Sequence, residues 1–69
     1  MPYVNVKITP DGATAERKAR VIAGITRVLV EVLDKDPAQT MIVIDEVATD
    51  DWGIAGESVT TRRRREGGR

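Results

Sequence analysis

Residues 40–44 read Thr-Met-Ile-Val-Ile, a short run with four apolar side chains in succession. A strand with one face in water alternates apolar and polar residues, whereas an unbroken apolar run predicts a strand covered on both faces, as in a parallel sheet. Segment 3–9 differs, because Val4, Val6 and Ile8 alternate with mostly polar residues. This alternation predicts a second strand that is buried on one face only.

The segment between the two strands has the pattern of an amphipathic helix. Thr14 is a good N-cap residue, and the sequence Pro-Asp-Gly at 10–12 before it predicts a turn. Apolar residues then recur with a helical period at Val21, Ile25, Val28 and Val32. This spacing predicts one helix of about 20 residues. The helix should end before Pro37, because proline disfavours the helical conformation in the preceding residue.

Together these elements predict a small α+β fold, a β-α-β unit whose right-handed crossover makes the two strands parallel. A loop at 48–57 should lead to a short C-terminal strand or hairpin at 58–61. We expect one domain at residues 1–61 and a disordered basic tail at 62–69. One helix covers only one face of the sheet, so another subunit must cover the other, and the sheet is completed by oligomerisation.

Composition excludes several classes of function. The 69-residue chain has eleven basic and eleven acidic residues, which argues against nucleic acid or a membrane as a partner, and the arginine run 62–65 is interpreted as solubilising. Without cysteine or histidine a disulfide is excluded and a metal site such as zinc is disfavoured. No apolar run reaches the roughly 20 residues of a membrane span, and no signal peptide is recognisable, so we expect a cytoplasmic protein.

Pro2 is the main candidate for a catalytic group. If Met1 is removed, Pro2 carries a free secondary amine, the one group in this chain expected to titrate near neutral pH. Such an amine can serve as a general base at pH 7 if burial or a nearby cation lowers its pKa. The alternative is that Pro2 is only a stiff first residue of a strand.

Two further segments complete a family pattern with Pro2. They are Ile-Asp-Glu-Val at 44–47 and Trp-Gly-Ile-Ala-Gly-Glu at 52–57. With these features the chain resembles the 4-oxalocrotonate tautomerase family over residues 2–61. The resemblance implies a cofactor-independent isomerase, a homohexamer built as a trimer of dimers, with Pro2 as the general base. In such an enzyme the proline takes a proton from an enol or 2-hydroxy-dienoate acid and returns it to a different carbon.

The resemblance also assigns a role to Trp52, which stands where the family usually has a phenylalanine that forms the apolar wall of the pocket. An aromatic wall that excludes water disfavours the ammonium form of the amine and lowers its pKa. Trp52 can also be read as a packing residue of the core or of an interface, and the two roles are compatible. Asp45 and Glu46 are adjacent, so in a strand they point to opposite faces and do not form a catalytic pair.

The chain departs from the family at two substrate-binding arginines. Ala13 and Met41 (or its neighbour Thr40) stand at the expected positions, so we expect weak activity on dicarboxylates and better activity on monocarboxylic or aryl enols. Arg17 is the candidate replacement for binding the substrate, although a solvated helix-face residue is the plainer reading. Lys7 is a second candidate with the same alternative. A hydratase or dehalogenase using the same proline, or a non-catalytic subunit of a mixed oligomer, are the rival functions.

Overall fold

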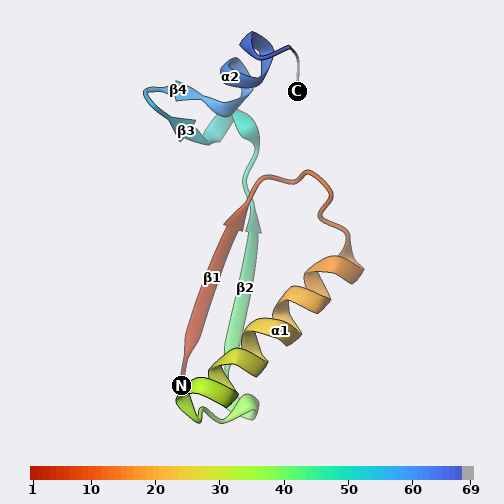
Figure 1. Cartoon of the computed structure of the whole chain (residues 1–69), viewed down its shortest axis with the longest axis vertical. Helices are drawn as coiled ribbons and strands as arrows, with labels where there is room; N and C mark the ends of the chain where they lie inside the picture. Colours follow the sequence, from red (N-terminus) through yellow and green to blue (C-terminus); the bar gives the residue numbers. More distant parts are fainter. Residues whose placement is uncertain (68–69) are drawn as a thin grey trace.

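Two parallel strands with one helix packed across them form the centre of the chain (Figure 1). The computed structural model describes residues 1–67. The elements, in chain order, are β1 (Tyr3–Ile8), α1 (Ala15–Leu33), the 3₁₀ turn η1 (Pro37–Gln39), β2 (Met41–Glu46), the 3₁₀ turn η2 (Thr49–Asp51), β3 (Gly53–Ile54), β4 (Glu57–Ser58) and α2 (Val59–Arg65). The predicted α+β class and the β-α-β unit are therefore confirmed.

The register of the parallel pair explains why the apolar run 40–44 lacks alternation. Tyr3 pairs with Met41, and Ile8 pairs with Glu46. Ile42 and Ile44 are half-buried on the side of α1, whereas Met41 and Val43 lie on the opposite face with 49% and 41% of their surface exposed. Both faces of β2 are apolar, as predicted, but a single chain covers only one of them.

The same register separates two adjacent carboxylates. Asp45 accepts hydrogen bonds from Asn5 and Lys7, both at 2.9 Å, on the exposed face of the sheet. Glu46 forms an ion pair with Lys18 of α1. The two carboxylates therefore point to opposite faces, as expected for neighbours in a strand.

Helix α1 begins and ends where the sequence predicts. The Thr14 side chain accepts a hydrogen bond from the Arg17 backbone N–H at 3.1 Å, which caps the first turn. Asp34 ends the helix in the left-handed conformation with φ of 54°. Pro37 then occupies the first turn of η1, whose cap is the Asp36 carboxylate. No helix among residues 1–67 combines the length and the apolar character needed to cross a membrane.

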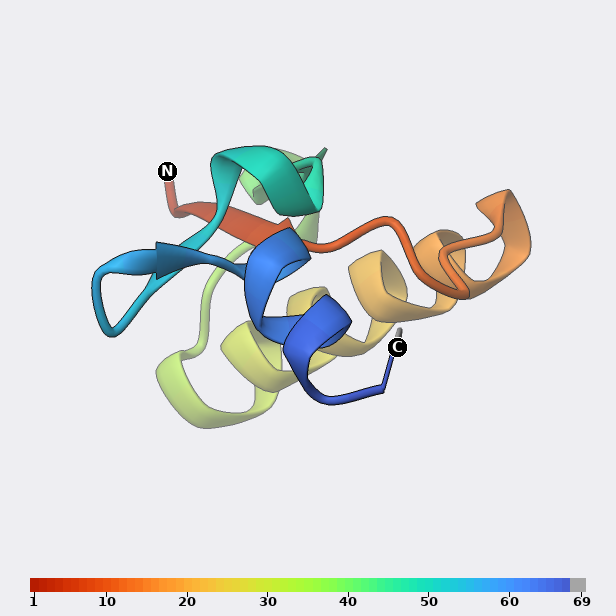
Figure 2. The same cartoon turned by 90° about the horizontal axis from the view of Figure 1, so that it is seen from above.

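Beyond β2 the chain leaves the β-α-β unit and forms an arm, which we define as residues 48–67. The arm contains η2, the β3–β4 hairpin and α2, and it lies past the end of the sheet (Figures 1 and 2). Ala55 and Gly56 connect β3 and β4 with φ values of 53° and 84°, the positive pair that a tight two-residue hairpin turn requires. The hairpin pairs Gly53 with Ser58 and Ile54 with Glu57.

The end of the arm corrects the sequence prediction. The predicted short C-terminal strand or hairpin exists as the β3–β4 hairpin, but it lies at residues 53–58 rather than 58–61. Helix α2 spans Val59–Arg65, so the predicted boundary at 61 falls inside a helix and residues 62–65 are helical rather than disordered. Ser58 caps this helix by accepting from the Thr61 backbone N–H at 3.1 Å, and Arg62 pairs with Glu66 one turn later at 3.4 Å. Residues 68–69 of the expected tail lie outside the described residues.

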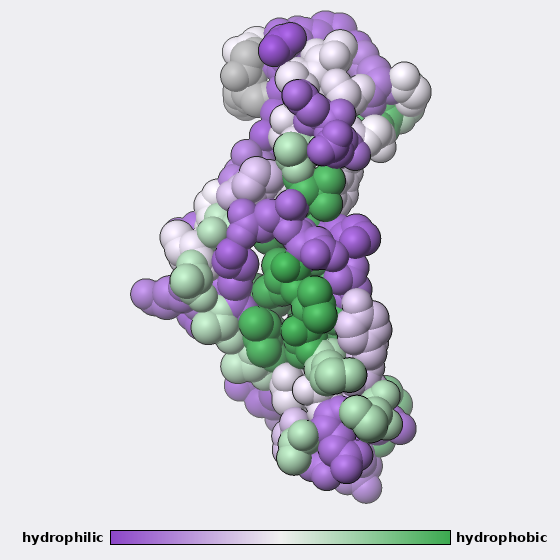
Figure 3. Space-filling view, turned by 180° about the vertical axis from the view of Figure 1, so that it is seen from behind, coloured by the Kyte–Doolittle hydropathy of each residue, from purple (hydrophilic) through white to green (hydrophobic). Residues whose placement is uncertain are grey.

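The chain is too extended to bury its own core. Its radius of gyration is 15.5 Å, compared with about 11 Å for a compact domain of this length. Its accessible surface is 5179 Å² for 7.6 kDa, compared with about 4,300 Å² for a compact monomer. No side chain among residues 1–67 is fully buried, and a hydrophobic patch occupies the middle of one face (Figure 3). This exposure fits self-association.

Candidate functional site

Pro2 lies at the start of β1 and is held there by the sheet. Its carbonyl accepts a hydrogen bond from the Met41 backbone N–H at 3.0 Å, and the residue is half-buried. Met1 precedes it with 82% of its surface exposed. With Met1 in place the Pro2 nitrogen is part of an amide bond, so removal of this exposed residue is needed to create the amine. That amine would then sit at a defined position beside the start of β2.

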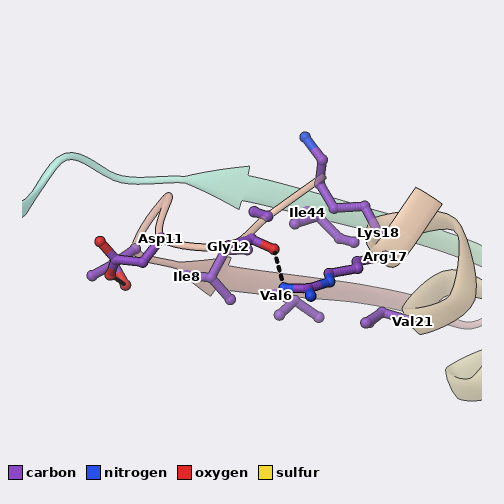
Figure 4. A pocket seen from close by; sticks show the side chains of 10 residues that line it. Val6, Ile8, Asp11, Gly12, Arg17, Lys18, Val21 and Ile44 are labelled. Atoms are coloured by element: carbon purple, nitrogen blue, oxygen red, sulfur yellow. Dashed lines mark hydrogen bonds between the residues drawn. The ribbon is translucent and has the colours of Figure 1, made fainter. Parts of the chain in front are cut away.

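A cleft opens at the other end of the same strand, where β1 leads into α1. Its volume is about 350 Å³, within the range of about 300–1,000 Å³ typical of small-molecule sites. The large apolar side chains of the strands and the helix line it, namely Val6, Ile8, Val21 and Ile44, and the connecting loop forms its rim. Figure 4 shows the loop, with Asp11 at one end of the cleft and Arg17 extending across it. The cleft therefore combines an apolar lining with cations at its edge.

Arg17 is the cation best placed to meet a ligand in this cleft. One Nη1–H donates to the Gly12 carbonyl at 3.1 Å, which draws the guanidinium over the apolar lining beside Val6 (Figure 4). Arg17 has no ion-pair partner within residues 1–67, whereas Lys18 on the same rim pairs with Glu46. The remaining guanidinium donors match the oxygens of a carboxylate.

The rim of the cleft is tied to the arm through Asp11. Both carboxylate oxygens accept from Arg63 of α2, at 3.0 and 2.8 Å, and one also accepts from the Thr9 hydroxyl at 2.7 Å. The hydrogen bonds from Arg63, followed by the one from Thr9, hold the pKa of Asp11 well below its usual range. The Asp11 carboxylate is therefore occupied by hydrogen-bond partners rather than available as a base.

Trp52 lies in the arm, away from both Pro2 and the cleft lining. Its backbone joins the arm's elements, since its N–H donates to the Thr49 carbonyl at 3.4 Å and its carbonyl accepts from Val59 at 2.7 Å. Its side chain is half-buried. Because Trp52 follows the end of β2 and Pro2 precedes the start of β1, the two residues lie at opposite ends of the parallel pair.

One chain therefore does not bring the predicted site residues together. Pro2 and Arg17 are separated by the length of β1, which is about 20 Å for six residues. Lys7, the other candidate cation, lies outside the cleft because it pairs with Asp45 at 2.9 Å on the exposed face. Ala13 does line the cleft, which places one of the positions of the missing arginines at its rim.

Sequence reasoning missed the pair of Asp11 and Arg63. The local sequence places Asp11 in a turn and predicts Arg63 to lie in a disordered tail. The two are 52 residues apart, so no local pattern signals their contact. Within residues 1–67 no group of three or more acidic side chains is suited to hold a metal ion.

Comparisons with known proteins agree that the chain is similar to tautomerases. The family model for the tautomerase enzyme matches residues 2–62. The "Probable tautomerase K2" of Dickeya dadantii is 61% identical over 64 residues, which cover 93% of this chain and 96% of that protein. The crystal structure of DmpI from Helicobacter pylori superposes with a TM-score of 0.86 at 38% identity, covering 91% of this chain and 97% of the other. One of the 4-oxalocrotonate tautomerase isozymes of Methylibium petroleiphilum superposes with a TM-score of 0.85 at 30% identity, covering 93% and 98%.

Proposed function

Since the chain belongs to the tautomerase enzyme family, within its 4-oxalocrotonate tautomerase group, we propose that it uses the Pro2 amine to move a proton between carbons of an enol or 2-hydroxy-dienoate acid. Family membership confirms the resemblance found in the sequence and supports tautomerase activity. No cofactor is required, because the amine itself takes the proton from the substrate and the resulting ammonium returns it to a different carbon.

The observation that carries the proposal is the position of Pro2. Its carbonyl accepts a hydrogen bond from the Met41 backbone N–H, which fixes the backbone of Pro2 against β2. A free amine on this residue would therefore point in a defined direction. A general base is useful only within hydrogen-bond reach of the proton it removes, and a fixed strand end meets that requirement better than a loose terminus. The chain also lacks histidine and cysteine, the usual groups that exchange protons near neutral pH.

We infer that a complete site needs two copies of the chain. Strand β1 pairs with β2 along one edge only. Pairing of the free edges of two copies about a two-fold axis is antiparallel. If the two β1 strands pair about their midpoints, Tyr3 of one copy lies opposite Ile8 of the other. Pro2 of the first copy then lies opposite Thr9 of the second copy, at the rim of the second copy's cleft. The base would then come from one copy, and Arg17 with the apolar lining from the other.

The arm supports a larger assembly. It extends past the sheet and carries Trp52, which is half-buried within one chain. We propose that Trp52 forms the apolar wall of a site on a neighbouring copy, in a homohexamer arranged as a trimer of dimers. An apolar wall of this kind favours enols with an aryl or alkyl group. A substrate with one carboxylate is favoured as well, because Arg17 is the single cation that the proposal assigns to substrate binding.

The test is a mixture of two variants that are each expected to have impaired activity, Pro2→Ala and Arg17→Ala. Intact-mass measurement first establishes that Met1 has been removed from each preparation. After unfolding and joint refolding at equal amounts, random pairing would restore about a quarter of the sites, because each complete site takes its proline and its arginine from different copies. Each variant refolded alone is the control.

Two outcomes would count against the proposal. Recovery no greater than the average of the two variants would show that Pro2 and Arg17 do not combine across an interface. A preparation that is fully active while wholly retaining Met1 would rule out the proline amine as the base.

A further inference from the structure

The loop that borders the cleft is bound from outside the β-α-β unit. It runs over residues 9–14, and Arg63 reaches it from α2 with two parallel N–H···O bonds to Asp11. The side chains are 35% and 56% exposed, so the pair is accessible at the surface of a single chain. A two-pronged arginine–carboxylate contact fixes geometry as well as distance.

From Asp11 the contacts continue through the loop to Arg17. The Thr9 hydroxyl donates a hydrogen bond to the Asp11 carboxylate, and the Ala13 N–H donates one to the Pro10 carbonyl at 3.2 Å. The Gly12 carbonyl accepts from both the Thr14 N–H at 3.2 Å and the Arg17 guanidinium at 3.1 Å. The direction of that carbonyl depends on the loop conformation, so the loop also orients Arg17.

Close packing at Gly12 strengthens the dependence of the Arg17 orientation on the loop conformation. It adopts φ of +68°, and a Cβ at this residue would lie 3.2 Å from Arg17 Nη1. The guanidinium therefore packs directly against the Gly12 backbone. A rotation of the loop at Asp11 would move both the carbonyl that Arg17 bonds and the surface that it packs on.

Arg63 differs from its neighbours in α2. Arg65 pairs with Glu57 at 2.6 Å and Arg62 pairs with Glu66 at 3.4 Å, and all four of these residues belong to the arm. Among the ion pairs of residues 1–67, the one between Arg63 and Asp11 is the one that joins α2 to the cleft. Arg65 therefore offers a matched control in the same helix, with an ion pair that does not touch the loop.

We propose that Arg63 is a positioning residue that, by binding Asp11, holds the loop 9–14 so that Arg17 is oriented to bind the carboxylate of the substrate. This inference rests on the proposed function, because it deepens the role given there to Arg17. It assigns the arm a second task besides carrying Trp52, namely control of carboxylate affinity in the cleft of its own chain.

The first experiment measures binding without turnover. Phenylacetate, an unreactive aryl monocarboxylate, is titrated by calorimetry into the assembled parent, Arg63→Ala, Arg63→Lys and the control Arg65→Ala. We expect Arg63→Ala to raise Kd about 3- to 10-fold, a coupling of ordinary size for residues in one hydrogen-bonded network. Arg63→Lys keeps the charge but loses the two-pronged geometry, so it should give an intermediate Kd, and Arg65→Ala should match the parent.

The second experiment tests the route through Arg17. Arg63→Ala is repeated in an Arg17→Ala background, where it should no longer change Kd, and Asp11→Asn should weaken binding in the same direction as Arg63→Ala. For enol substrates, Arg63→Ala should raise KM while leaving kcat within about twofold, because orientation of a binding cation is lost and the base is untouched.

Several results would overturn the inference. They are equal Kd values for Arg63→Ala and Arg65→Ala, an undiminished effect of Arg63→Ala without Arg17, and no binding of phenylacetate to the parent. Failure of the proposed base is seen separately, as unchanged turnover in Pro2→Ala, since the binding measurement needs no catalysis.

Discussion

The β-α-β unit and the arm are built on different principles. The unit has a 19-residue helix packed on two six-residue parallel strands, so it has a recognisable apolar layer between them. The arm has two two-residue strands and a seven-residue helix, and its order comes from caps, a tight turn and ion pairs. Short elements of this kind are marginal on their own. The comparison indicates that the arm depends on contacts beyond its own residues, through Arg63 and, in the proposed assembly, through other copies.

The first prediction contrasts a charge placed in each region. Val43→Lys puts a cation on the uncovered face of β2, which the proposed assembly buries, at a cost of several kcal/mol against a total stability of about 5–15 kcal/mol. We expect loss of assembly and of folding, measured by light scattering and circular dichroism. Ile54→Lys, at an exposed position of the hairpin, is the arm's counterpart and should leave the helical signal of α1 intact. A folded monomer of the parent or of Val43→Lys would contradict an oligomeric core.

The second prediction separates the roles of Pro2 and Trp52. Pro2→Ala keeps a terminal amine but makes it primary and more mobile, so we expect kcat to fall about 10²- to 10⁴-fold, the usual value of a general base, with assembly unchanged. Trp52→Ala, in the arm, should instead raise KM for aryl enols more than it lowers kcat. Steady-state kinetics on both variants test this division, and unchanged turnover in Pro2→Ala would refute the role of the base.

The third prediction concerns the substrate and compares two ligands on one preparation. With Ala13 and Met41 in place of two arginines, the loss of two charge-assisted contacts should cost about 10²–10⁴ in kcat/KM for a dicarboxylate, relative to an arginine-bearing relative. A monocarboxylic or phenylpyruvate-like enol should lose less and compete well with 2-hydroxymuconate. A hundredfold preference for the dicarboxylate would require another cation in the site.

The smallest expected effects compare the two helix caps. Thr14→Ala and Ser58→Ala each remove one side-chain acceptor from a first-turn N–H, worth about 1 kcal/mol of local helix stability. We expect Thr14→Ala to lower the midpoint of global unfolding, because α1 is part of the core. Ser58→Ala should mainly speed amide hydrogen exchange in α2 and leave the midpoint close to that of the parent. Equal shifts in the midpoint would mean that unit and arm unfold together.

The two regions also differ in how far the sequence predicts them. In the unit, hydrophobic periodicity and the caps at Thr14 and Asp36 agree with one another, so the helix and both strands were found with their order and direction. In the arm the same kind of reasoning predicts a short strand or hairpin, which is present but at residues 53–58, and a disordered tail where α2 is helical. The short segment after Ser58 has no apolar period, and the helix there depends on its cap and on the pairing of Arg62 with Glu66.

For the candidate site, the sequence alone determined which residues are present: a proline at position 2, which we propose as the base, a tryptophan at 52, which we propose as the wall, and no arginine at the two positions where the family resemblance expects one. These are properties of residue type and order, and their interpretation comes from the resemblance to the family. Only the tertiary structure showed that Pro2, Arg17 and Trp52 are apart in one chain and that Arg63 binds Asp11. Those relations depend on how the elements are arranged in space. Parallel strands place their starts at one end of the sheet and their ends at the other, which separates Pro2 from Arg17 and Trp52. The arm, although it comes last in the chain, contacts the loop between β1 and α1 through Arg63 and Asp11.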